Sequence, residues 1–263
     1  MHPALLLLLV QAPDLAALAE KARPAVVKLA AEDVLGNEVG NGTGFFVSAD
    51  GRILTNHHVI QGEPKLVALL EGKRRVAILG VLADDEENDL AVLQAAPGSY
   101  PMLSLEAGRD ARVGESVAVI GSPIGWAGTL SNGIVSATRE EGADFDDLGF
   151  GKRPSWQIQI SAPISPGSSG SPVLAEDGKV LGVAVGRDFR GQALNFAIPA
   201  KKGLALLASI PPGAKPRPLS AAVAPPSRTA RNLAISAGVF LLLAGVAWIV
   251  LRRPRAGPAP YDA

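Results

Sequence analysis

The sequence predicts an all-β fold for most of this 263-residue chain. Between Ala25 and Pro199 the apolar residues, many of them β-branched, occur in short runs that Gly, Asp, Asn and Pro separate. Roughly a dozen such runs, at spacings of about 8 to 15 residues, are typical of an all-β sandwich or a pair of barrels. A stretch of about 175 residues is also long enough to bury its own core. We therefore expect an all-β body and not alternating strands and helices.

The candidate strands follow from these runs, because each run is too short to form a helix. The clearest candidates are residues 26–29, 44–47, 66–69, 76–79, 90–93, 117–120, 157–160, 180–183 and 196–198. Helical periodicity is confined to residues 15–22, before the first strand, and 201–209, after the last. The predicted body, residues 13–209, thus has one helix at each end.

The charges and the absence of cysteine exclude several functional classes. The 25 basic and 25 acidic side chains are scattered, whereas a nucleic-acid-binding protein needs clustered Lys and Arg, so we expect no nucleic-acid partner. Without cysteine, disulfides, thiol nucleophiles and thiolate metal sites are excluded. The adjacent His57 and His58 make a poor metal site. We expect neither a metal nor another cofactor.

Charged residues make up only 19% of the chain, against about 25% in ordinary soluble domains, which suggests segments made for lipid. Residues 4–10 are an uninterrupted apolar run that is too short to span a bilayer and has the length found in export signals. We interpret residues 1–12 as a signal peptide. The alternative is a buried N-terminal helix.

A second uncharged run, residues 232–251, has the length of a transmembrane helix, since as a helix it would span about 30 Å. Three arginines follow at once and begin a short basic tail, 252–263, as after a stop-transfer segment. The Pro-rich stretch 210–231 cannot form a packed core, and we expect an extended tether. Together with the signal peptide, this single-pass anchor predicts an extracytoplasmic body, periplasmic or extracellular, and a cytoplasmic tail.

Three segments of the body carry the residue types of a serine hydrolase. They are residues 42–59 with His57 and His58, 88–92 with Asp89, and 166–172 with Ser168 and Ser169. Acyl transfer to serine needs a base, a carboxylate that orients the imidazole, and donors for the oxyanion. The order His, Asp, Ser is that of the chymotrypsin type of triad. Each residue alone has an ordinary structural explanation, and it is their joint occurrence that indicates catalysis.

The glycines around Ser169 predict the oxyanion donors. Gly167 and Gly170 permit backbone conformations that turn two amide N–H groups toward one point. We expect the oxyanion hole to consist of the N–H groups of Gly167 and Ser169. A Gly-Ser cluster on its own is more often a surface turn.

Longer motifs carry a family resemblance. The motifs GTGFFVSADGRILTNHHV at 42–59, GSPIG at 121–125 and SNGIVS at 131–136 resemble those of the HtrA (Deg) family of trypsin-like serine proteases. The resemblance implies two six-stranded β-barrels with the active site in the cleft between them. It also implies that His58 is the base, Asp89 the orienting acid and Ser169 the nucleophile. His57 and Ser168 are the nearest competitors, but neighbours on a strand point to opposite faces, so only one of each pair can serve.

The chain departs from the family pattern in several places. Members usually carry PDZ domains after the protease, whereas this sequence passes from the body into the tether. The loop 31–41 is short, which argues against family-style cage assembly through it and leaves another homo-oligomer open. Ser171 stands where glycine is common and could crowd the strand that follows the nucleophile. The polar loop 139–154 corresponds to one that, in the family, couples activator binding to ordering of the active site.

The motif alignment also predicts a specificity pocket. It puts Pro163 at the base and Ala184, Val185, Gly186 and Leu194 on the walls. No carboxylate is present among them, so a substrate Lys or Arg would be buried without a partner. We expect cleavage after small or medium apolar residues.

Our interpretation is a membrane-anchored serine endopeptidase that acts on polypeptides, in particular on unfolded or damaged envelope proteins. The rival interpretation is a catalytically silent trypsin-fold module that binds peptides or serves as a scaffold at the membrane. The acidic run 84–87 could suggest a two-carboxylate glycosidase or a cation site, but we interpret it as a solvated loop because its charges are adjacent in sequence.

Overall fold

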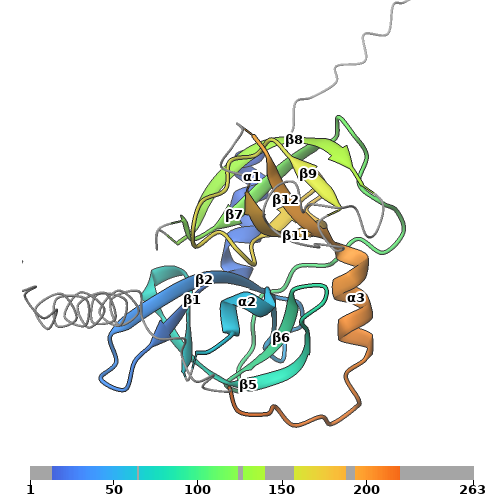
Figure 1. The fold of residues 1–263 in the computed structure, drawn as a ribbon. Coiled ribbons are helices and arrows are strands. Elements are labelled where there is room, and N and C mark those ends of the chain that lie inside the picture. Colours follow the sequence, from blue (N-terminus) through green and yellow to red (C-terminus); the bar gives the residue numbers. More distant parts are fainter. Residues whose placement is uncertain (1–13, 64, 124–126, 140–156, 188–192, 220–263) are drawn as a thin grey trace, which may run out of the picture. The chain divides into compact units, whose positions relative to one another are not determined.

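The computed structural model describes residues 14–63, 65–123, 127–139, 157–187 and 193–219. Within these ranges twelve strands close into two barrels of six strands each (Figure 1). The expected architecture of two six-stranded β-barrels is therefore confirmed.

The first barrel is formed by the N-terminal half of the chain. Its strands are β1 (Val26–Glu32), β2 (Glu38–Phe46), β3 (Arg52–Thr55), β4 (Leu66–Leu69), β5 (Arg75–Asp85) and β6 (Leu90–Ala95). Around the barrel they follow the order β1-β2-β3-β6-β5-β4. All neighbouring strands are antiparallel, as short connections require.

The second barrel repeats this design. Its strands are β7 (Ser116–Gly121), β8 (Thr129–Thr138), β9 (Ile158–Ile160), β10 (Pro172–Leu174), β11 (Val180–Arg187) and β12 (Asn195–Pro199), in the order β10-β11-β12-β9-β8-β7. The predicted runs lie on the observed strands but omit β3, β8 and β10. β8 has polar residues that interrupt the apolar pattern.

The strands where the two barrels meet are apolar on both faces. Phe46 and Ile53 belong to the core inside the first barrel. Their neighbours Phe45 and Leu54 belong to a second cluster, which also contains Phe196 of the second barrel. All five side chains are at most 1% exposed. Burial on both faces explains why these runs are continuous and do not alternate between apolar and polar residues.

Both predicted helices are present. α1 (Leu15–Ala22) begins after Asp14, whose carboxylate accepts a hydrogen bond from the Ala17 N–H at 2.9 Å, as an N-cap does. α3 (Ala200–Ala208) follows β12 directly and lies beside both barrels (Figure 1). The remaining helical turns of the described residues are η1 (Arg23–Ala25), α2 (His57–Ile60) and η2 (Glu71–Lys73).

Residues 211–219, which we call the strap, differ from the expected extended tether. The Arg217 N–H donates to the Val81 carbonyl on β5 at 2.9 Å, and the Val81 N–H donates to the Arg217 carbonyl at 2.8 Å. Leu219 packs against the core of the first barrel. Arg217 lies between Pro216 and Pro218 but keeps its own N–H, so a single antiparallel bridge at a strand edge can form. This part of the Pro-rich stretch therefore packs on the barrel.

Several predicted segments lie outside the described residues. They are the signal peptide 1–12, residues 220–231 of the tether, the membrane helix 232–251, the tail 252–263 and most of the loop 139–154. Among the helices within the described ranges, none has the length and apolar character needed to cross a bilayer.

The loop 31–41 forms a tight hairpin between β1 and β2. The Asp33 carboxylate accepts hydrogen bonds from the N–H groups of Leu35 and Asn37, both at 2.8 Å, and so closes the turn. Val34 and Leu35 at the tip are 97% and 83% exposed.

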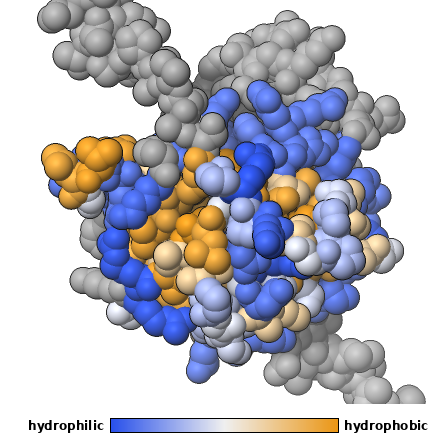
Figure 2. Space-filling view, turned by 90° about the horizontal axis from the view of Figure 1, so that it is seen from below, coloured by the Kyte–Doolittle hydropathy of each residue, from blue (hydrophilic) through white to orange (hydrophobic). Residues whose placement is uncertain are grey.

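Figure 2, a view from below, shows apolar residues gathered on one side of the molecular face with hydrophilic residues around them.

Candidate active site

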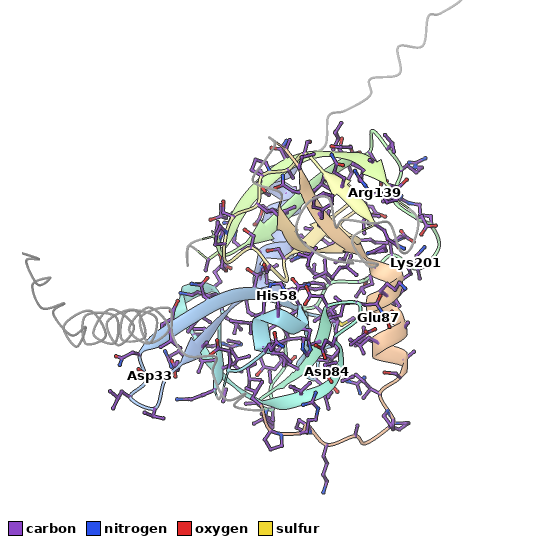
Figure 3. The ribbon with its side chains drawn as sticks, in the orientation of Figure 1. Asp33, His58, Asp84, Glu87, Arg139 and Lys201 are labelled. Carbon is purple, nitrogen blue, oxygen red and sulfur yellow. The ribbon has the colours of Figure 1, made fainter. Side chains whose placement is uncertain are left out.

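His58 and Asp89 form the best-defined pair of the site. The Asp89 carboxylate accepts from the His58 backbone N–H at 2.9 Å through Oδ1 and contacts the His58 ring Nδ1 at 2.8 Å through Oδ2. A carboxylate that accepts a hydrogen bond from Nδ1 keeps the imidazole proton on that nitrogen and leaves Nε2 free as an acceptor. Figure 3 shows His58 at the end of the first barrel that faces the second barrel.

The turn between β5 and β6 holds Asp89 in an uncommon backbone conformation. Asp89 has φ +53°, a left-handed value that few residues other than glycine adopt. The Asp85 carboxylate bonds the Asn88 N–H at 2.9 Å and its side-chain amide at 2.6 Å. Asn56, which is fully buried, donates to the Asp89 carbonyl at 2.9 Å. The surroundings therefore fix this strained residue, as they commonly do at functional sites.

The adjacent histidines contact different carboxylates. His57 and His58 begin the short helix α2, so the expected strand alternation between them was wrong, and about 100° of helical rotation separates them instead. His57 Nδ1 lies 3.4 Å from Asp84 Oδ2. His58 is 43% exposed at its side chain and His57 only 15%, so His58 is the more accessible imidazole.

The acidic run is more than a solvated loop. Asp85 stabilises the turn before Asp89, and Asp84 Oδ1 lies 2.5 Å from the guanidinium of Arg217 on the strap. Asp84 and Asp85 thus bind partners outside the acidic run and do not face each other. This arrangement is unlike the facing carboxylate pair of a glycosidase.

The loop between β9 and β10 presents Ser169. Its hydroxyl donates to the Val185 carbonyl on β11 at 3.2 Å. Ser168 is 4% exposed, and its Oγ accepts from the Ser165 N–H at 3.2 Å, so this hydroxyl faces the interior. Among the contacts of the described residues, none joins Ser169 Oγ to His58.

The backbone of this loop carries two N–H groups of particular interest. The Ser168 N–H bonds the Ser165 carbonyl at 2.8 Å around Pro166 and Gly167, and Gly167 has φ +93°. Proline followed by a residue with positive φ is the pattern of a type II turn. Within the described part of the chain, the N–H groups of Gly167 and Ser169 bond no acceptor. This is the pair from which the sequence predicts an oxyanion hole.

The residues of the predicted specificity pocket are only partly brought together. Ala184 and Val185 are buried on β11 beside the serine loop, where the Ala184 carbonyl accepts from the Gly170 N–H at 2.8 Å. Gly186 follows on the same strand, and Leu194 is partly buried against the cluster between the barrels. Pro163 is exposed, and its carbonyl accepts from the Ser131 hydroxyl at 2.7 Å.

Asn195 is a residue of this region that no sequence motif singles out. It is 5% exposed, and its side-chain amide donates to the Ala162 carbonyl at 2.9 Å, which ties the start of β12 to the segment before the serine loop. An amide side chain directly before the apolar run 196–198 is the sequence signal that could have identified it.

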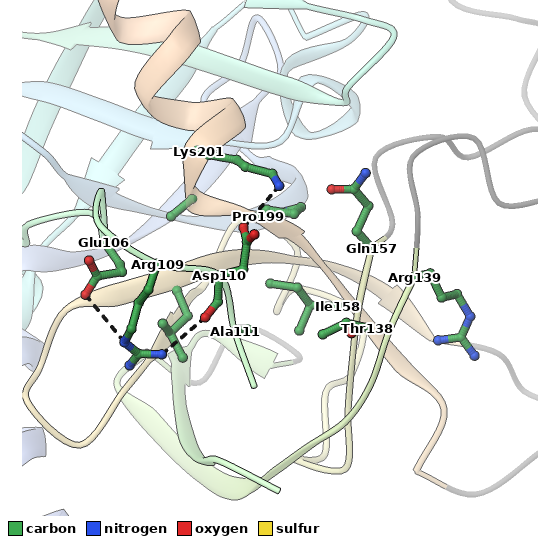
Figure 4. Close-up of a pocket in the computed structure, with 12 residues that line it drawn as sticks. Glu106, Arg109, Asp110, Ala111, Thr138, Arg139, Gln157, Ile158, Pro199 and Lys201 are labelled. Carbon is green, nitrogen blue, oxygen red and sulfur yellow. Dashed lines mark hydrogen bonds and ion pairs between the residues drawn. The ribbon is translucent and has the colours of Figure 1, made fainter. Parts of the chain in front are cut away.

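A cavity of about 370 Å³ lies on the second barrel (Figure 4). Two of its cationic side chains pair with carboxylates, since Lys201 lies 3.0 Å from Asp110 and Arg109 contacts Glu106 and Glu115. A third, Arg139, donates to the side-chain oxygen of Gln159 at 2.6 Å. Among the described residues that line it, there is no histidine or serine. The cavity therefore offers no second catalytic constellation.

Comparisons with known proteins point to one family. The model of the trypsin-like peptidase domain matches residues 42–183. A probable periplasmic serine endoprotease DegP-like from Hahella chejuensis is 36% identical over 161 residues, which is 60% of this chain and 33% of that protein. Serine protease HTRA1B from Danio rerio is 38% identical over 189 residues, 70% of this chain and 38% of that protein. The chain thus spans about a third of the length of these relatives.

Solved structures agree in fold. The HtrA-type protease AlgW, solved with a tripeptide, superposes with a TM-score of 0.66 at 31% identity, covering 77% of this chain and 65% of that chain. The serine endoprotease from Yersinia pestis gives a TM-score of 0.63 at 26% identity, covering 76% and 68%.

Proposed function

Because the chain belongs to the trypsin-like peptidase domain family, we propose that it is a serine endopeptidase of HtrA type. The observation that carries the proposal is the Asp89 carboxylate, which bonds both the backbone N–H and the ring of His58. That arrangement prepares an imidazole to act as a base. A nearby serine hydroxyl and the N–H groups of the serine loop supply the remaining parts.

In the proposed mechanism Ser169 attacks the scissile carbonyl while His58 Nε2 takes its proton. Asp89 keeps the imidazole oriented and stabilises its charged form. The N–H groups of Gly167 and Ser169 receive the oxyanion. Collapse of the tetrahedral intermediate breaks the C–N bond as His58 returns the proton to the leaving amine. Water then hydrolyses the acyl-enzyme by the same route.

One step of this mechanism requires the exchange of a hydrogen bond. The Ser169 hydroxyl donates to the Val185 carbonyl and must leave it before it can donate to His58. Serine rotamers of partly exposed residues interconvert rapidly, so this barrier is small compared with that of the chemistry. The same contact is the observation that favours the rival function, a catalytically silent peptide-binding module.

Labelling with a fluorophosphonate probe separates these two functions. We expect the wild type to be labelled and Ser169→Ala to be unlabelled, with Ser168→Ala as the matched control that keeps labelling. Peptide hydrolysis should be lost in the same variant. A wild type that remains unlabelled while it binds peptides would favour the silent module.

The substrate preference is proposed from the same region. Ala184, Val185 and Gly186 make the stretch of β11 beside Ser169 apolar, and no carboxylate occurs among the predicted pocket residues. We therefore propose cleavage after small or medium apolar residues. Peptides that differ only in Val or Arg before the scissile bond test this, since comparable kcat/KM values for both would contradict it.

The cellular setting is a further part of the proposal. A relative is described as a probable periplasmic serine endoprotease, and the chain carries the apolar segments 4–10 and 232–251. We propose an extracytoplasmic protease on a single-pass anchor that acts on unfolded or damaged envelope proteins, alone or as a homo-oligomer. Extraction of membranes with alkaline carbonate should release a variant lacking residues 232–263 but not the full chain.

A further inference from the structure

Thr43 lies on β2 of the first barrel, and its side chain is fully buried. In the sequence it is distinguished only by its place in the motif at 42–59. Its surroundings are unusual for a strand residue, because its neighbours include the loop of the second barrel that carries Ser169. We define the oxyanion loop as residues 165–170.

All the polar atoms of Thr43 are used in hydrogen bonds. The hydroxyl donates to the Gly167 carbonyl at 2.7 Å and accepts from the Ser122 N–H at 3.0 Å. The Thr43 N–H donates to the Ser169 carbonyl at 2.8 Å, and its carbonyl accepts from the Thr55 hydroxyl at 2.6 Å. The direction of the hydroxyl bond is fixed, since a carbonyl can only accept.

These bonds determine how the oxyanion loop is oriented. The Gly167 carbonyl belongs to the planar peptide that also contains the Ser168 N–H, and that N–H bonds Ser165. Both the carbonyl and the N–H of this peptide are therefore hydrogen-bonded. The Ser169 carbonyl is held as well. The peptide that carries the Ser169 N–H therefore lies between two held peptides, and its own carbonyl, that of Ser168, accepts from the Ser171 N–H at 3.0 Å. The peptide that carries the Gly167 N–H adjoins the held peptide of Gly167 and Ser168, which limits how far it can turn. Glycine on its own would not keep this conformation, because it adopts many.

Gly170 provides independent evidence that this contact is specific. A Cβ atom on Gly170 would lie 1.9 Å from the Thr43 carbonyl oxygen, a distance that no side chain can occupy, and Gly170 has φ +87°. The two backbones can approach so closely only because residue 170 is glycine. The oxyanion loop of the second barrel is thus fastened to the barrel that carries His58 and Asp89.

From this geometry we infer that Thr43 is a positioning residue, which sets the conformation of the oxyanion loop through its hydroxyl. The inference rests on the proposed peptidase function and adds a residue that touches no substrate. Its effect would be felt in the transition state, where the oxyanion forms, and not in ground-state binding.

A pair of substitutions separates the hydroxyl from the shape of the side chain. Thr43→Val keeps the shape and removes the hydroxyl, whereas Thr43→Ser keeps the hydroxyl and removes the methyl group. For Thr43→Val we expect kcat to fall by about 10- to 100-fold with KM within about twofold, because a misdirected oxyanion donor is comparable to a partly lost one. Thr43→Ser should stay within about threefold of the wild type.

Inhibitors give a readout that a merely structural role would not change. The affinity of a peptide aldehyde, whose adduct places an oxygen in the oxyanion hole, should weaken in Thr43→Val by the same factor as kcat/KM. A peptide that lacks the residue whose carbonyl is attacked leaves the hole empty, and its affinity should remain unchanged. Thermal unfolding verifies that both variants are folded, and Thr43→Ala replaces Thr43→Val if the latter is not. A kcat within threefold of the wild type, or a loss confined to KM, would overturn the inference.

A crystal structure of Thr43→Val tests the inference apart from the proposed function. A Gly167 carbonyl turned away from residue 43 supports the inference, and a carbonyl in its present orientation overturns it. This outcome can be judged even if the wild type hydrolyses no peptide, in which case the proposed function alone fails.

Discussion

His57 and His58 are adjacent in sequence, yet each contacts its own carboxylate. His58 shares two bonds with Asp89, while His57 lies 3.4 Å from Asp84, which in turn pairs with Arg217. Two imidazoles of the same chemistry thus have different surroundings. The short helix α2 causes the difference, since it turns the two side chains apart.

This contrast predicts unequal effects of the same substitution. His58→Ala should lower kcat/KM by at least about 10,000-fold, because the base is lost. His57→Ala, the matched control, should lower kcat/KM by less than about tenfold, since it removes only the contact between His57 and Asp84. Steady-state hydrolysis of a peptide substrate measures both. Equal losses in two folded variants would contradict the assignment.

Glu32 is one of the residues through which acid should weaken the fold. It is 3% exposed, and hydrogen bonds from Lys65 and Arg75 hold the pKa of its carboxyl below the usual value. A lowered folded pKa means that this stabilisation is complete above the unfolded pKa of about 4.3 and is lost as the pH falls through the folded value.

Glu32→Gln should therefore be less stable than the wild type at pH 7 and should lose less stability between about pH 5 and 3. Urea unfolding across this range, followed by circular dichroism, gives the two slopes. Parallel slopes for wild type and variant would show that Glu32 does not contribute to the acid response.

At the scale of elements, the strap is held by contacts that need a glycine on β5. A Cβ on Gly80 would lie 2.1 Å from the Arg217 carbonyl oxygen, and Gly80 has φ +148°. The strap also brings Arg217 to Asp84, and Asp84 in turn contacts His57 on α2. The chain that leads away from the body is thus fastened close to the element that carries His58.

Gly80→Ala should displace the strap. We expect a loss of about 1–3 kcal/mol in unfolding free energy and faster proteolytic cleavage within residues 211–219. Gly36→Ala is the control, because Gly36 also has positive φ, +84°, but no atom lies within 4 Å of the position that its Cβ would occupy. Limited proteolysis followed by mass spectrometry compares the two. Identical cleavage patterns would contradict a tightly fastened strap.

Among the elements, those with a strong local pattern were predictable and those defined by pairing were not. Residues 15–22 carry a helical period, and most strands carry a short apolar run. α2 has only four residues, too few for a helical period, and β8 combines Ser131, Asn132 and Gly133 with apolar residues. Such elements form because partners already in place accept their hydrogen bonds.

At the scale of the whole molecule, one apolar cluster joins the two barrels. Phe45 and Leu54 of the first barrel and Phe196 of the second are buried in it. Loss of packing there affects both barrels, so we expect the two barrels to unfold together.

Leu54→Ala should lower the unfolding free energy by about 2–5 kcal/mol and keep a single transition. Val34→Ala, at a site that is 97% exposed, is the control and should change stability by less than about 0.5 kcal/mol. Differential scanning calorimetry of the full chain in detergent measures both variants. Two separate transitions for Leu54→Ala would indicate barrels that unfold independently.

The sequence by itself determined the all-β class, most strands, both terminal helices of the body, and the His, Asp and Ser segments of the candidate site. These features depend on local patterns: short β-branched runs, helical periodicity, and motifs of a few residues.

Only the tertiary structure decided which histidine faces Asp89, which serine hydroxyl is accessible, where the strap packs, and what holds the oxyanion loop. Thr43 and Gly167 are 124 residues apart in sequence, and the bridge from Val81 to Arg217 crosses a similar distance. Contacts of this kind exist only after both barrels have closed, because burial and hydrogen bonding between distant segments select the partners, and no local pattern encodes them.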